Sequence, residues 1–296
     1  MREDMSSSYR GRFAPSPTGD LHFGSLVAAL GSWLRARAAG GSWLVRIEDL
    51  DPPREVAGAA DRILAMLAAH GMRPDEPVLC QSQRASRYDA ALEELIARGI
   101  AFPCACSRRQ LEASSGLHRA ACPRPEATAA HAWRARVPEL AVEFDDARIG
   151  RYRQELRREV GDFVLKRNDG LHAYQLAVVV DDAAQGISEV VRGADLLDST
   201  PRQIWLQRQL GLPTPRYLHL PLVLDEHGRK LGKSLASQPL RADDPLPALR
   251  AALRFLGQPD PTHCGDVTAL LQSAVAKFSV DSIPLPIPSR MPEDNV

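Results

Sequence analysis

Apolar residues recur at helical spacing in several stretches of the chain. The first stretch ends at Gly40, and its apolar positions are Leu26, Val27, Leu30, Trp33 and Leu34. The second spans 54–71, and its apolar positions are Val56, Ile63, Leu64 and Leu67. Both patterns predict an amphipathic helix, because the apolar residues share one face and the stretch stops at a glycine. Helices are also expected over 88–99 and 199–211, and a last one after Pro245 would turn inward Leu249, Leu253 and Leu256.

Strands are expected between these helices. The stretch 42–50, "SWLVRIEDL", suits a buried strand that ends in carboxylates, and 218–224 is another apolar run. Two further stretches, 174–182 and 187–197, alternate as a buried sheet does. Helices and strands in this order are typical of an α/β fold with a parallel sheet. The stretch 101–170 breaks the pattern, since it lacks a long apolar period and is rich in arginine, and it is interpreted as an inserted subdomain.

The composition excludes some classes of protein. The chain has 296 residues, of which 44% are hydrophobic, so it can bury a sizeable core. Lysine plus arginine and aspartate plus glutamate both number 37, so any contact with nucleic acid must come from local patches. No stretch approaches the roughly 20 apolar residues that span a bilayer. The chain start also lacks the apolar core of a signal peptide, so a cytoplasmic protein is expected.

Two short motifs suggest phosphate chemistry. Prolines and glycines crowd the stretch 12–24, "RFAPSPTGDLHFG", and His22 and Gly24 stand at the start of the first helix. A helix N-terminus offers unpaired N–H groups to phosphates, and glycine lets the backbone approach a ligand closely. Lys230 and Lys233 stand in "KLGKS", a cationic loop that can clamp a triphosphate. Taken alone, the first motif is equally compatible with a simple turn, and most runs like the second are solvated loops.

Together the motifs closely resemble class I aminoacyl-tRNA synthetases of the glutamyl branch. "LHFG" stands where that family has a His-x-Gly-His motif, and "KLGKS" where it has a Lys-Met-Ser-Lys-Ser loop. "RFAPSPTG", "VRIEDLD", "AVVVDD" and "VRGADLL" resemble further glutamyl signatures, so the resemblance covers about residues 9–257. Ser25 and Gly232 depart from the two motifs, but the histidine and both lysines remain. The resemblance implies an α/β, Rossmann-type parallel-sheet catalytic domain.

The resemblance also implies a reaction, in which the carboxylate of L-glutamate attacks the α-phosphate of Mg-ATP. His22 and Lys233 are the implied catalytic residues, and the implied ATP-binding residues are His22, Gly24, Lys230 and Lys233. The implied glutamate-binding residues are Arg12, Phe13, Ala14, Pro15, Ser16, Glu48, Tyr174 and Arg192. In that set the arginines bind carboxylates, Glu48 binds the ammonium group, and the hydroxyls donate hydrogen bonds. The alternative for Glu48 and Arg192 is a structural ion pair.

A separate cluster suggests a metal. Its pattern is Cys-x-Cys-x11-His-x3-Cys, formed by Cys104, Cys106, His118 and Cys122. Three thiolates and an imidazole make a complete tetrahedral set, which predicts one structural zinc ion. The alternative is a coincidental group of buried cysteines, but the resemblance supports a metal, because related proteins carry zinc in this insert. Cys80 and Cys264 are expected to be free thiols.

These expectations give a plan of four parts. Residues 9–100 form the first half of the Rossmann catalytic domain, and 101–170 form an inserted zinc-binding subdomain of the kind that binds an acceptor arm. Residues 171–240 form the second half with the KLGKS loop, and 241–296 form a short helical C-terminal region with a proline-rich tail. Only about forty residues follow Leu256, so no anticodon-binding domain is expected.

This layout resembles a truncated branch of the family, the glutamyl-Q tRNA(Asp) synthetases. That branch activates glutamate without tRNA and attaches it to the queuosine base in the anticodon of tRNA(Asp). The implied partners are L-glutamate, ATP and queuosine-bearing tRNA(Asp), with no membrane, and a monomer is expected. The arginines expected to follow RNA phosphates are Arg148, Arg151, Arg153, Arg157, Arg158 and Arg167. The alternatives are a truncated glutamyl-tRNA synthetase that charges the 3′ end of tRNA(Glu), and a non-catalytic tRNA-binding paralogue.

Overall fold

The computed structural model describes residues 9–112, 117–118, 122, 131–223, 240–261 and 263–286. The strands are β1 (Arg10–Phe13), β2 (Ser42–Ile47), β3 (Leu79–Cys80), β4 (Ala101–Cys104), β5 (Ala132–Ala135), β6 (Ala141–Asp146), β7 (Gly150–Glu155), β8 (Val164–Lys166), β9 (Glu189–Gly193) and β10 (Arg216–Leu220). The helices are α1 (Phe23–Ala38), α2 (Ala59–Ala69), α3 (Ala85–Ala97), α4 (Arg108–Glu112), α5 (Tyr174–Ala184), α6 (Thr200–Gln209), α7 (Leu246–Phe255) and α8 (Val267–Ala276).

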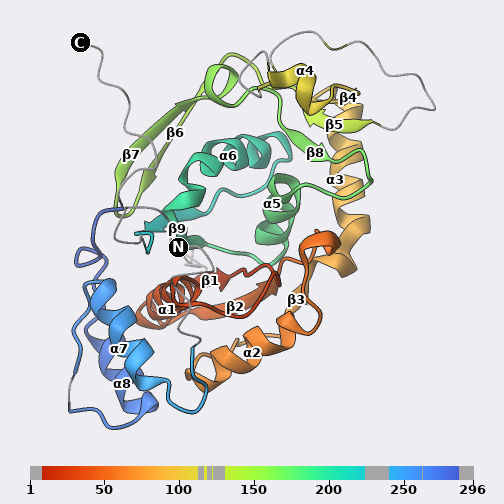
Figure 1. Cartoon of the computed structure of the whole chain (residues 1–296). Coiled ribbons are helices and arrows are strands. Elements are labelled where there is room, and N and C mark those ends of the chain that lie inside the picture. The colour runs from red at the N-terminus through yellow and green to blue at the C-terminus, as the bar shows by residue number, and fades with distance from the viewer. Residues whose placement is uncertain are drawn as a thin grey trace, which may run out of the picture.

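Most strands form one central layer (Figure 1). β1, β2 and β3 pair in parallel, and β9, β10 and β6 pair in parallel within a sheet of order β7-β6-β10-β9. The two sheets meet where β1 lies beside β9, because the Ser188 amide donates to the Arg10 carbonyl at 2.9 Å. Outward from this junction lie β2 and then β3 on one side, and β10, β6 and β7 on the other. The predicted parallel-sheet α/β fold is thereby confirmed.

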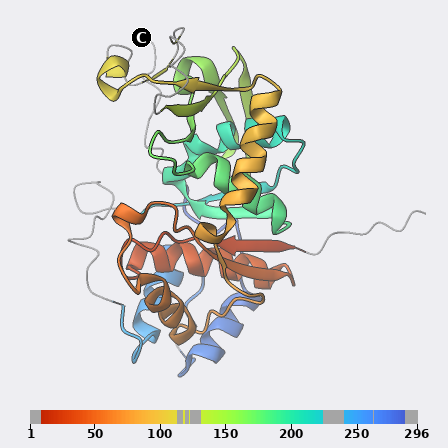
Figure 2. The ribbon, with the colours of Figure 1, turned by 90° about the vertical axis from the view of Figure 1, so that its right-hand side faces the viewer.

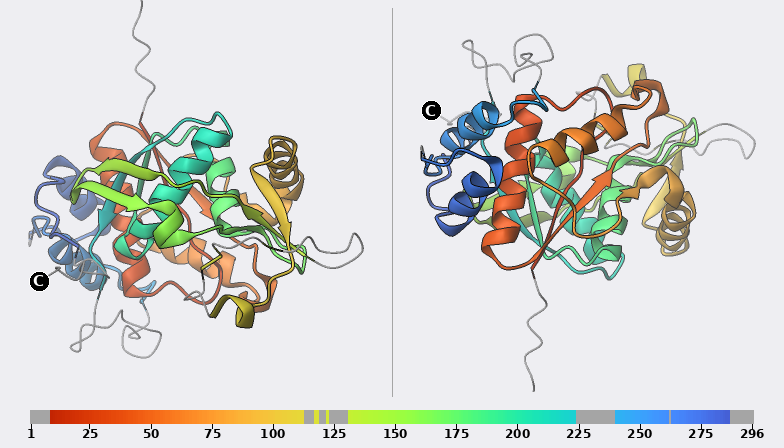
Figure 3. Two further views of the ribbon diagram at one scale, coloured as in Figure 1. Left: turned by 90° about the horizontal axis from the view of Figure 1, so that it is seen from above. Right: turned by 90° about the horizontal axis from the view of Figure 1, so that it is seen from below.

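Helices cover both faces of the layer. On β2 the side chains of Trp43, Val45 and Ile47 join a core with α1, α2, α7 and α8, whereas Leu44 joins a second core with α3, α5 and α6. Arg46 faces the same side as Leu44, because side chains alternate along a strand. Figure 2 shows α7 and α8 at the opposite end of the molecule from β4 and β5, and Figure 3 shows them beside α1.

The stretch 101–170 contributes to two sheets. β4, β5 and β8 form a small antiparallel sheet of order β4-β5-β8. β6 and β7 form an antiparallel hairpin, and β6 joins the central layer alongside β10, where Tyr217 stands opposite Asp146. Backbone pairing therefore ties part of this stretch to the central layer. The four-part domain plan itself remains a prediction.

The predicted helices are found, one predicted strand is wrong, and the predicted strand 187–197 ends at Gly193, where a 3-10 helix over Ala194–Ser199 begins. Residues 174–182 lie in helix α5 rather than in a strand. The helix is buried around much of its circumference between α3, α6 and the sheet, so its apolar residues follow no single face and the helical period is hidden. Val56 also differs from expectation, since it precedes α2 and is 44% exposed. No helix in the described part of the chain is both long and apolar enough to cross a membrane.

Candidate functional site

Two adjoining cavities lie at the carboxyl ends of the central strands. The larger has a volume of about 1110 Å³ and the smaller a volume of about 710 Å³. Both are lined by the loop after β1 and by the turn after β9, and they share Phe13, Ala14, Ser16, Thr18, Ala28, Gly193 and Asp195. Ligands of open α/β sheets bind at this place, where the strand order reverses.

The predicted ATP-binding and glutamate-binding residues that the structure describes all line these cavities. The larger cavity is lined by Arg12, Phe13, Ala14, Ser16, Glu48, Tyr174 and Arg192. The smaller cavity is lined by Phe13, Ala14, Pro15, Ser16, His22 and Gly24. The two predicted groups of ligand-binding residues therefore lie side by side. Lys230 and Lys233 lie outside the described residues.

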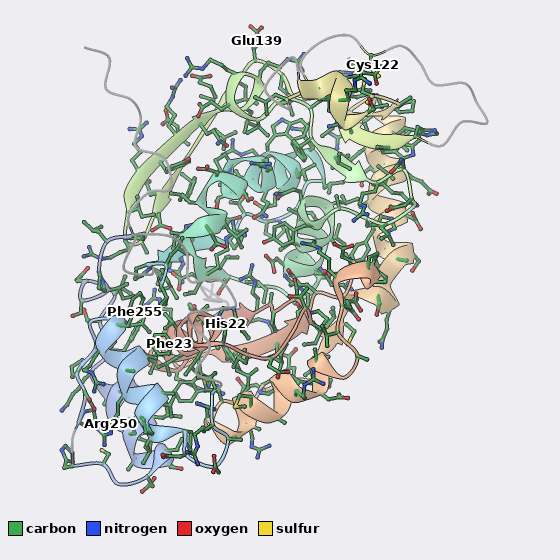
Figure 4. All side chains as sticks on the ribbon, viewed as in Figure 1. His22, Phe23, Cys122, Glu139, Arg250 and Phe255 are labelled. Atoms are coloured by element: carbon green, nitrogen blue, oxygen red, sulfur yellow. The ribbon has the colours of Figure 1, made fainter. Side chains whose placement is uncertain are left out.

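His22 is the N-cap of α1. Its Nδ1 accepts a hydrogen bond from the Ser25 amide at 3.2 Å, and its Nε2 lies 3.0 Å from the Ser25 hydroxyl. A Cβ at position 24 would come within 3.3 Å of the imidazole, so Gly24 keeps the space beside the ring open. Phe23 packs edge-on against Phe255 of α7, with 6.4 Å between ring centroids, and so fixes this end of α1 (Figure 4).

A chain of buried charges runs behind the larger cavity. Arg12 donates to both oxygens of Asp182, at 3.1 and 3.2 Å. Arg46 donates to Asp182 at 2.7 Å and to Glu48 Oε1 at 3.1 Å. Burial alone would raise the pKa of Asp182, but the two guanidinium groups outweigh it and lower that pKa to about 2. Burial raises the pKa of Glu48, although Arg46 and Arg12 oppose this effect.

Arg192 lies on β9 and is 5% exposed. Its guanidinium donates to four uncharged acceptors: His219 Nε2 at 3.2 Å, the Tyr174 hydroxyl at 3.3 Å, the Leu196 carbonyl at 3.3 Å and Thr200 Oγ1 at 2.7 Å. No carboxylate forms an ion pair with Arg192 in the described part of the chain. The alternative of a Glu48–Arg192 ion pair is not what the structure contains, since Glu48 pairs with Arg46.

Two residues that the sequence analysis did not single out lie behind Arg192. His219 on β10 places Nδ1 2.7 Å from Asp146 Oδ2, and both side chains are 0% exposed. Burial lowers the pKa of His219, so the imidazole is neutral near pH 7. The carboxylate of Asp146 accepts a hydrogen bond from the Nδ1–H group, and Nε2 is therefore the acceptor for Arg192.

The predicted metal ligands converge. One donor atom from each of Cys104, Cys106, His118 and Cys122 lies within 4.8 Å of all the others. The Sγ atom of Cys106 lies 3.3 Å from that of Cys122 and 3.7 Å from His118 Nε2. Zinc–sulfur bonds of about 2.3 Å in a tetrahedron place ligand atoms about 3.8 Å apart, so the four residues fit one such ion. Figure 4 shows Cys122 near β4 and β5, away from His22.

Asp162 orients the imidazole of this cluster. Its Oδ2 lies 2.9 Å from His118 Nδ1, so Nε2 is turned toward the thiols. Its Oδ1 accepts from the Val137 amide at 2.9 Å and from Arg157 at 2.6 Å, and these bonds fix the carboxylate. A carboxylate behind a ligating histidine is the usual support of a metal site. Cys104 and Cys106 also line the larger cavity, so the cluster forms part of its wall.

The arginines predicted to follow RNA phosphates have partners within the chain. Arg151 and Arg153 pair with Glu143, and Arg157 pairs with Asp162. Arg148 donates to the Ile283 carbonyl, and Arg167 pairs with Asp51 and Asp169. Arg158 also interacts within the protein. The side chains of Arg151 and Arg153 are 74% and 54% exposed. Such exposed pairs are weak, so a phosphate can compete for these two arginines.

Comparison with known proteins decides the family. Residues 8–262 match the model of the class I tRNA synthetases (E and Q), catalytic domain. The chain belongs to the class I tRNA synthetases. Within this family it is 59% identical over 285 residues to a protein of Xanthomonas campestris, with 95% of each chain covered. It is 60% identical over 266 residues to a protein of Burkholderia cenocepacia, with 86% of this chain and 89% of the relative covered. Both relatives are named glutamyl-Q tRNA(Asp) synthetase.

Solved structures agree with the fold of this class I synthetase. A glutamate tRNA ligase from Elizabethkingia meningosepticum superposes with a TM-score of 0.79 at 24% identity, covering 93% of this chain and 66% of that one. A glutamate-tRNA synthetase from Elizabethkingia anophelis gives a TM-score of 0.80 at 23% identity, covering 97% of this chain and 68% of that one. At such identities the likeness concerns the fold alone.

The residues that sequence reasoning missed carry a weak signal. Arg46 stands inside an apolar strand, Asp182 ends an apolar run, and His219 stands in "LHL" between buried leucines. A charged or polar residue in such a place must find a buried partner. The sequence does not say which partner, because the partners come from strands and helices far apart in the chain.

Proposed function

We propose that this synthetase activates L-glutamate with Mg-ATP, without tRNA, and transfers the glutamate to the queuosine base in the anticodon of tRNA(Asp). Two relatives at about 60% identity carry the name of that activity, which supports the choice of acceptor. The observation that carries the choice of amino acid is Arg192. This buried cation lines the larger cavity, and its protein partners named above are all uncharged.

Arg192 and Tyr174 together suit the side-chain carboxylate of glutamate. Of the five N–H groups of Arg192, the four bonds above leave one on Nη1 for a ligand. Burial raises the pKa of Tyr174, so its hydroxyl stays protonated and can donate a hydrogen bond to the ligand. Two donors side by side match carboxylate oxygens. Glutamine would bind poorly, because its amide would leave the arginine buried without a counter-charge.

Glu48 supplies the opposite charge in the same cavity. Arg46 holds Glu48 Oε1, and the carboxylate is proposed to bind the ammonium group of glutamate. Arg12 is proposed to contact the α-carboxylate through Nη1, because its pair with Asp182 uses Nε and Nη2. Phe13, Ala14, Pro15 and Ser16 follow Arg12 along the cavity walls and would wrap the amino acid.

The smaller cavity is proposed to hold ATP. His22 and Gly24 border it at the N-terminus of α1, where free amide groups favour phosphate oxygens. Lys230 and Lys233 are assigned to the triphosphate by their motif. The glutamate carboxylate attacks the α-phosphate, the bond between the α- and β-phosphates breaks, and pyrophosphate leaves. The protein therefore needs no nucleophile, and its task is to position the reactants and stabilise charge on the phosphate oxygens.

The cysteine and histidine cluster is proposed to hold one zinc ion. Three thiolates and one imidazole fill all four positions, so the site is structural and leaves no open position for a substrate. When bound, the ion would crosslink the four side chains and stabilise the folded form of this short segment. His118, with Asp162 behind it, is the fourth ligand.

The activation step is tested by pyrophosphate exchange. The purified protein should exchange label between pyrophosphate and ATP with L-glutamate and without any tRNA, and should do so poorly with L-glutamine. Equal exchange with both amino acids would mean that the carboxylate pocket is misassigned. No exchange with either would favour the non-catalytic paralogue.

The acceptor is tested with two forms of one tRNA. Labelled glutamate should appear on tRNA(Asp) that carries queuosine and not on the same tRNA with guanosine at that position. The label should persist when the 3′-terminal diol has been destroyed under conditions that protect the base. Label on the terminal adenosine of tRNA(Glu) would support the truncated glutamyl-tRNA synthetase instead.

A further inference from the structure

Asp146 and His219 form a buried pair directly behind Arg192. We propose that they are positioning residues for glutamate: they fix the orientation of the Arg192 guanidinium without neutralising its charge. The proposal rests on the activation of glutamate proposed above. Neither residue lines either cavity, so both act through Arg192 rather than on the substrate.

Three neighbouring strands bring these residues into line. His219 of β10 stands opposite Arg192 of β9 in the parallel register, and Asp146 ends β6 on the other side of β10. His219 shares its face of β10 with Tyr217, two residues earlier, whose ring stacks on the imidazole at 6.2 Å between centroids. The sheet itself therefore sets the spacing from carboxylate to imidazole to guanidinium.

Asp146 fixes the proton on the imidazole. Its Oδ2 accepts from the His219 amide at 3.0 Å and lies 2.7 Å from His219 Nδ1. Its Oδ1 accepts from the amides of Arg148 and Ile149, at 2.9 and 3.0 Å. A carboxylate held in this way can only accept, so Nδ1 must be the donor. Nε2 then has a free lone pair, which receives the Nε–H group of Arg192 at 3.2 Å.

The imidazole keeps the carboxylate away from the guanidinium. Arg12 shows the contrary arrangement in the same protein, because the carboxylate of Asp182 binds it directly as a counter-charge. Behind Arg192 a neutral ring stands in that place, so the arginine is held by a hydrogen bond and keeps its positive charge for a ligand. Thr200 completes the support, since its hydroxyl accepts from Arg192 and lies 3.2 Å from His219 Nε2.

Protonation of His219 would reverse this support. An imidazolium has no lone pair, and its Nε2–H group would face the Nε–H group of Arg192. The titratable or charged groups around the ring are Asp146, Arg192, Asp195 and Tyr217. Asp146 favours the protonated ring, whereas burial and Arg192 oppose it. Because burial lowers the pKa of His219 below the ordinary value of about 6.5, the KM for glutamate should rise only as the pH falls below that value.

Three variants, assayed by pyrophosphate exchange, distinguish a role of His219 and Asp146 in positioning Arg192 from a role in folding alone. His219→Leu removes the acceptor, and Asp146→Asn permits the wrong tautomer, so each should raise the KM for L-glutamate about tenfold or more and leave the KM for ATP unchanged. His219→Gln offers an amide oxygen near the place of Nε2, so it should restore most of the affinity. It should also lack the rise in KM at low pH that the unaltered protein shows, while keeping any change due to Glu48.

His70→Gln is the matched control. His70 is also 0% exposed, but among the described residues its side chain has one hydrogen-bond partner, the Met66 carbonyl, 2.8 Å from Nδ1, and it lines neither cavity. This variant should leave the KM for glutamate unchanged. Urea unfolding of every variant reports loss of fold separately, and if His219→Leu does not fold, the pH profile of His219→Gln decides.

The positioning role is overturned if the unaltered protein exchanges with glutamate and its KM profile below pH 6.5 is the same as that of His219→Gln. It is likewise overturned if a folded His219→Leu protein keeps both the KM for glutamate and the preference over L-glutamine. Absence of glutamate-dependent exchange in the unaltered protein would instead overturn the proposed function.

Discussion

Asp182→Asn removes a counter-charge that two buried arginines share, with almost no change in size. The side chains of Arg12 and Arg46 are 3% and 0% exposed, so neither can turn to water when the carboxylate is lost. Breaking a buried ion pair from one side costs about 3–5 kcal/mol, because it leaves an uncompensated charge in the interior. The amide can still accept hydrogen bonds, so the lower end of that range is expected.

The pKa of Asp182 gives a second estimate. It is about 2 in the folded protein, against about 3.9 for an ordinary aspartate, and this difference corresponds to about 2–3 kcal/mol. Since the folded-state pKa is the lower one, the stabilisation is complete above about pH 4 and is lost as the pH falls toward about 2. Both estimates agree on about 3 kcal/mol at pH 7. For a chain of this size that loss lowers Tm by about 6–12 °C.

Urea unfolding followed by circular dichroism at pH 7 measures the effect. Asp243→Asn is the matched control, because Asp243 forms an exposed pair with Arg241 in which the two side chains are 72% and 67% exposed. That variant should unfold as the unaltered protein does. If Asp182→Asn also lay within about 0.5 kcal/mol of the unaltered protein, the reasoning from buried charge would be refuted. Identical acid titrations of the two proteins between pH 4 and 2 would refute it as well.

Three further changes probe the rest of the site. Lys233→Ala should lower pyrophosphate exchange by about a hundredfold through loss of charge stabilisation, and near-normal exchange would remove the loop from the mechanism. Glu48→Gln should raise the KM for glutamate about tenfold while the KM for ATP stays constant, whereas Glu76→Gln, in an exposed pair with Arg10, should change neither. Cys104→Ser should lose the metal, about one zinc per chain by elemental analysis, and should impair transfer to tRNA more than activation. A stable unaltered protein that binds no metal would contradict the zinc assignment.

The sequence predicted the helices that are buried on one face, and it failed at α5, which is buried around much of its circumference. α2 and α7 were predictable because their buried residues recur at helical spacing and face one core. α5 was not, because "LAVVVDD" is buried around the helix and its three valines favour strands. The two aspartates that end this run look like a solvated helix terminus. Instead Asp182 is paired with Arg12 and Arg46, and Asp181 with Arg84, residues about 100 or more positions away.

The sequence predicted which residues form the candidate site, but not the ion pairs and hydrogen bonds that join them. Arg12, Glu48 and Arg192 were singled out by type and by resemblance, but both arginines had been assigned the same task. The structure separates them, because the carboxylate of Asp182 binds Arg12 directly as a counter-charge, whereas Arg192 is held by the neutral ring of His219. That difference depends on strand register, which brings His219 opposite Arg192, and no local pattern encodes register across separate strands.

Because β1 lies beside β9, one edge of β1 stays unpaired during synthesis until β9 has been made. Arg10 and Ser188 meet there across 178 residues. A ribosome adding about 5–20 residues per second needs about 10–35 s to cover that interval, and during it one edge of β1 has no partner. An open edge of this kind pairs readily with other chains. Slow translation through the arginine-rich stretch would lengthen the exposure, and a nascent chain released before β9 is made would leave the central sheet unclosed.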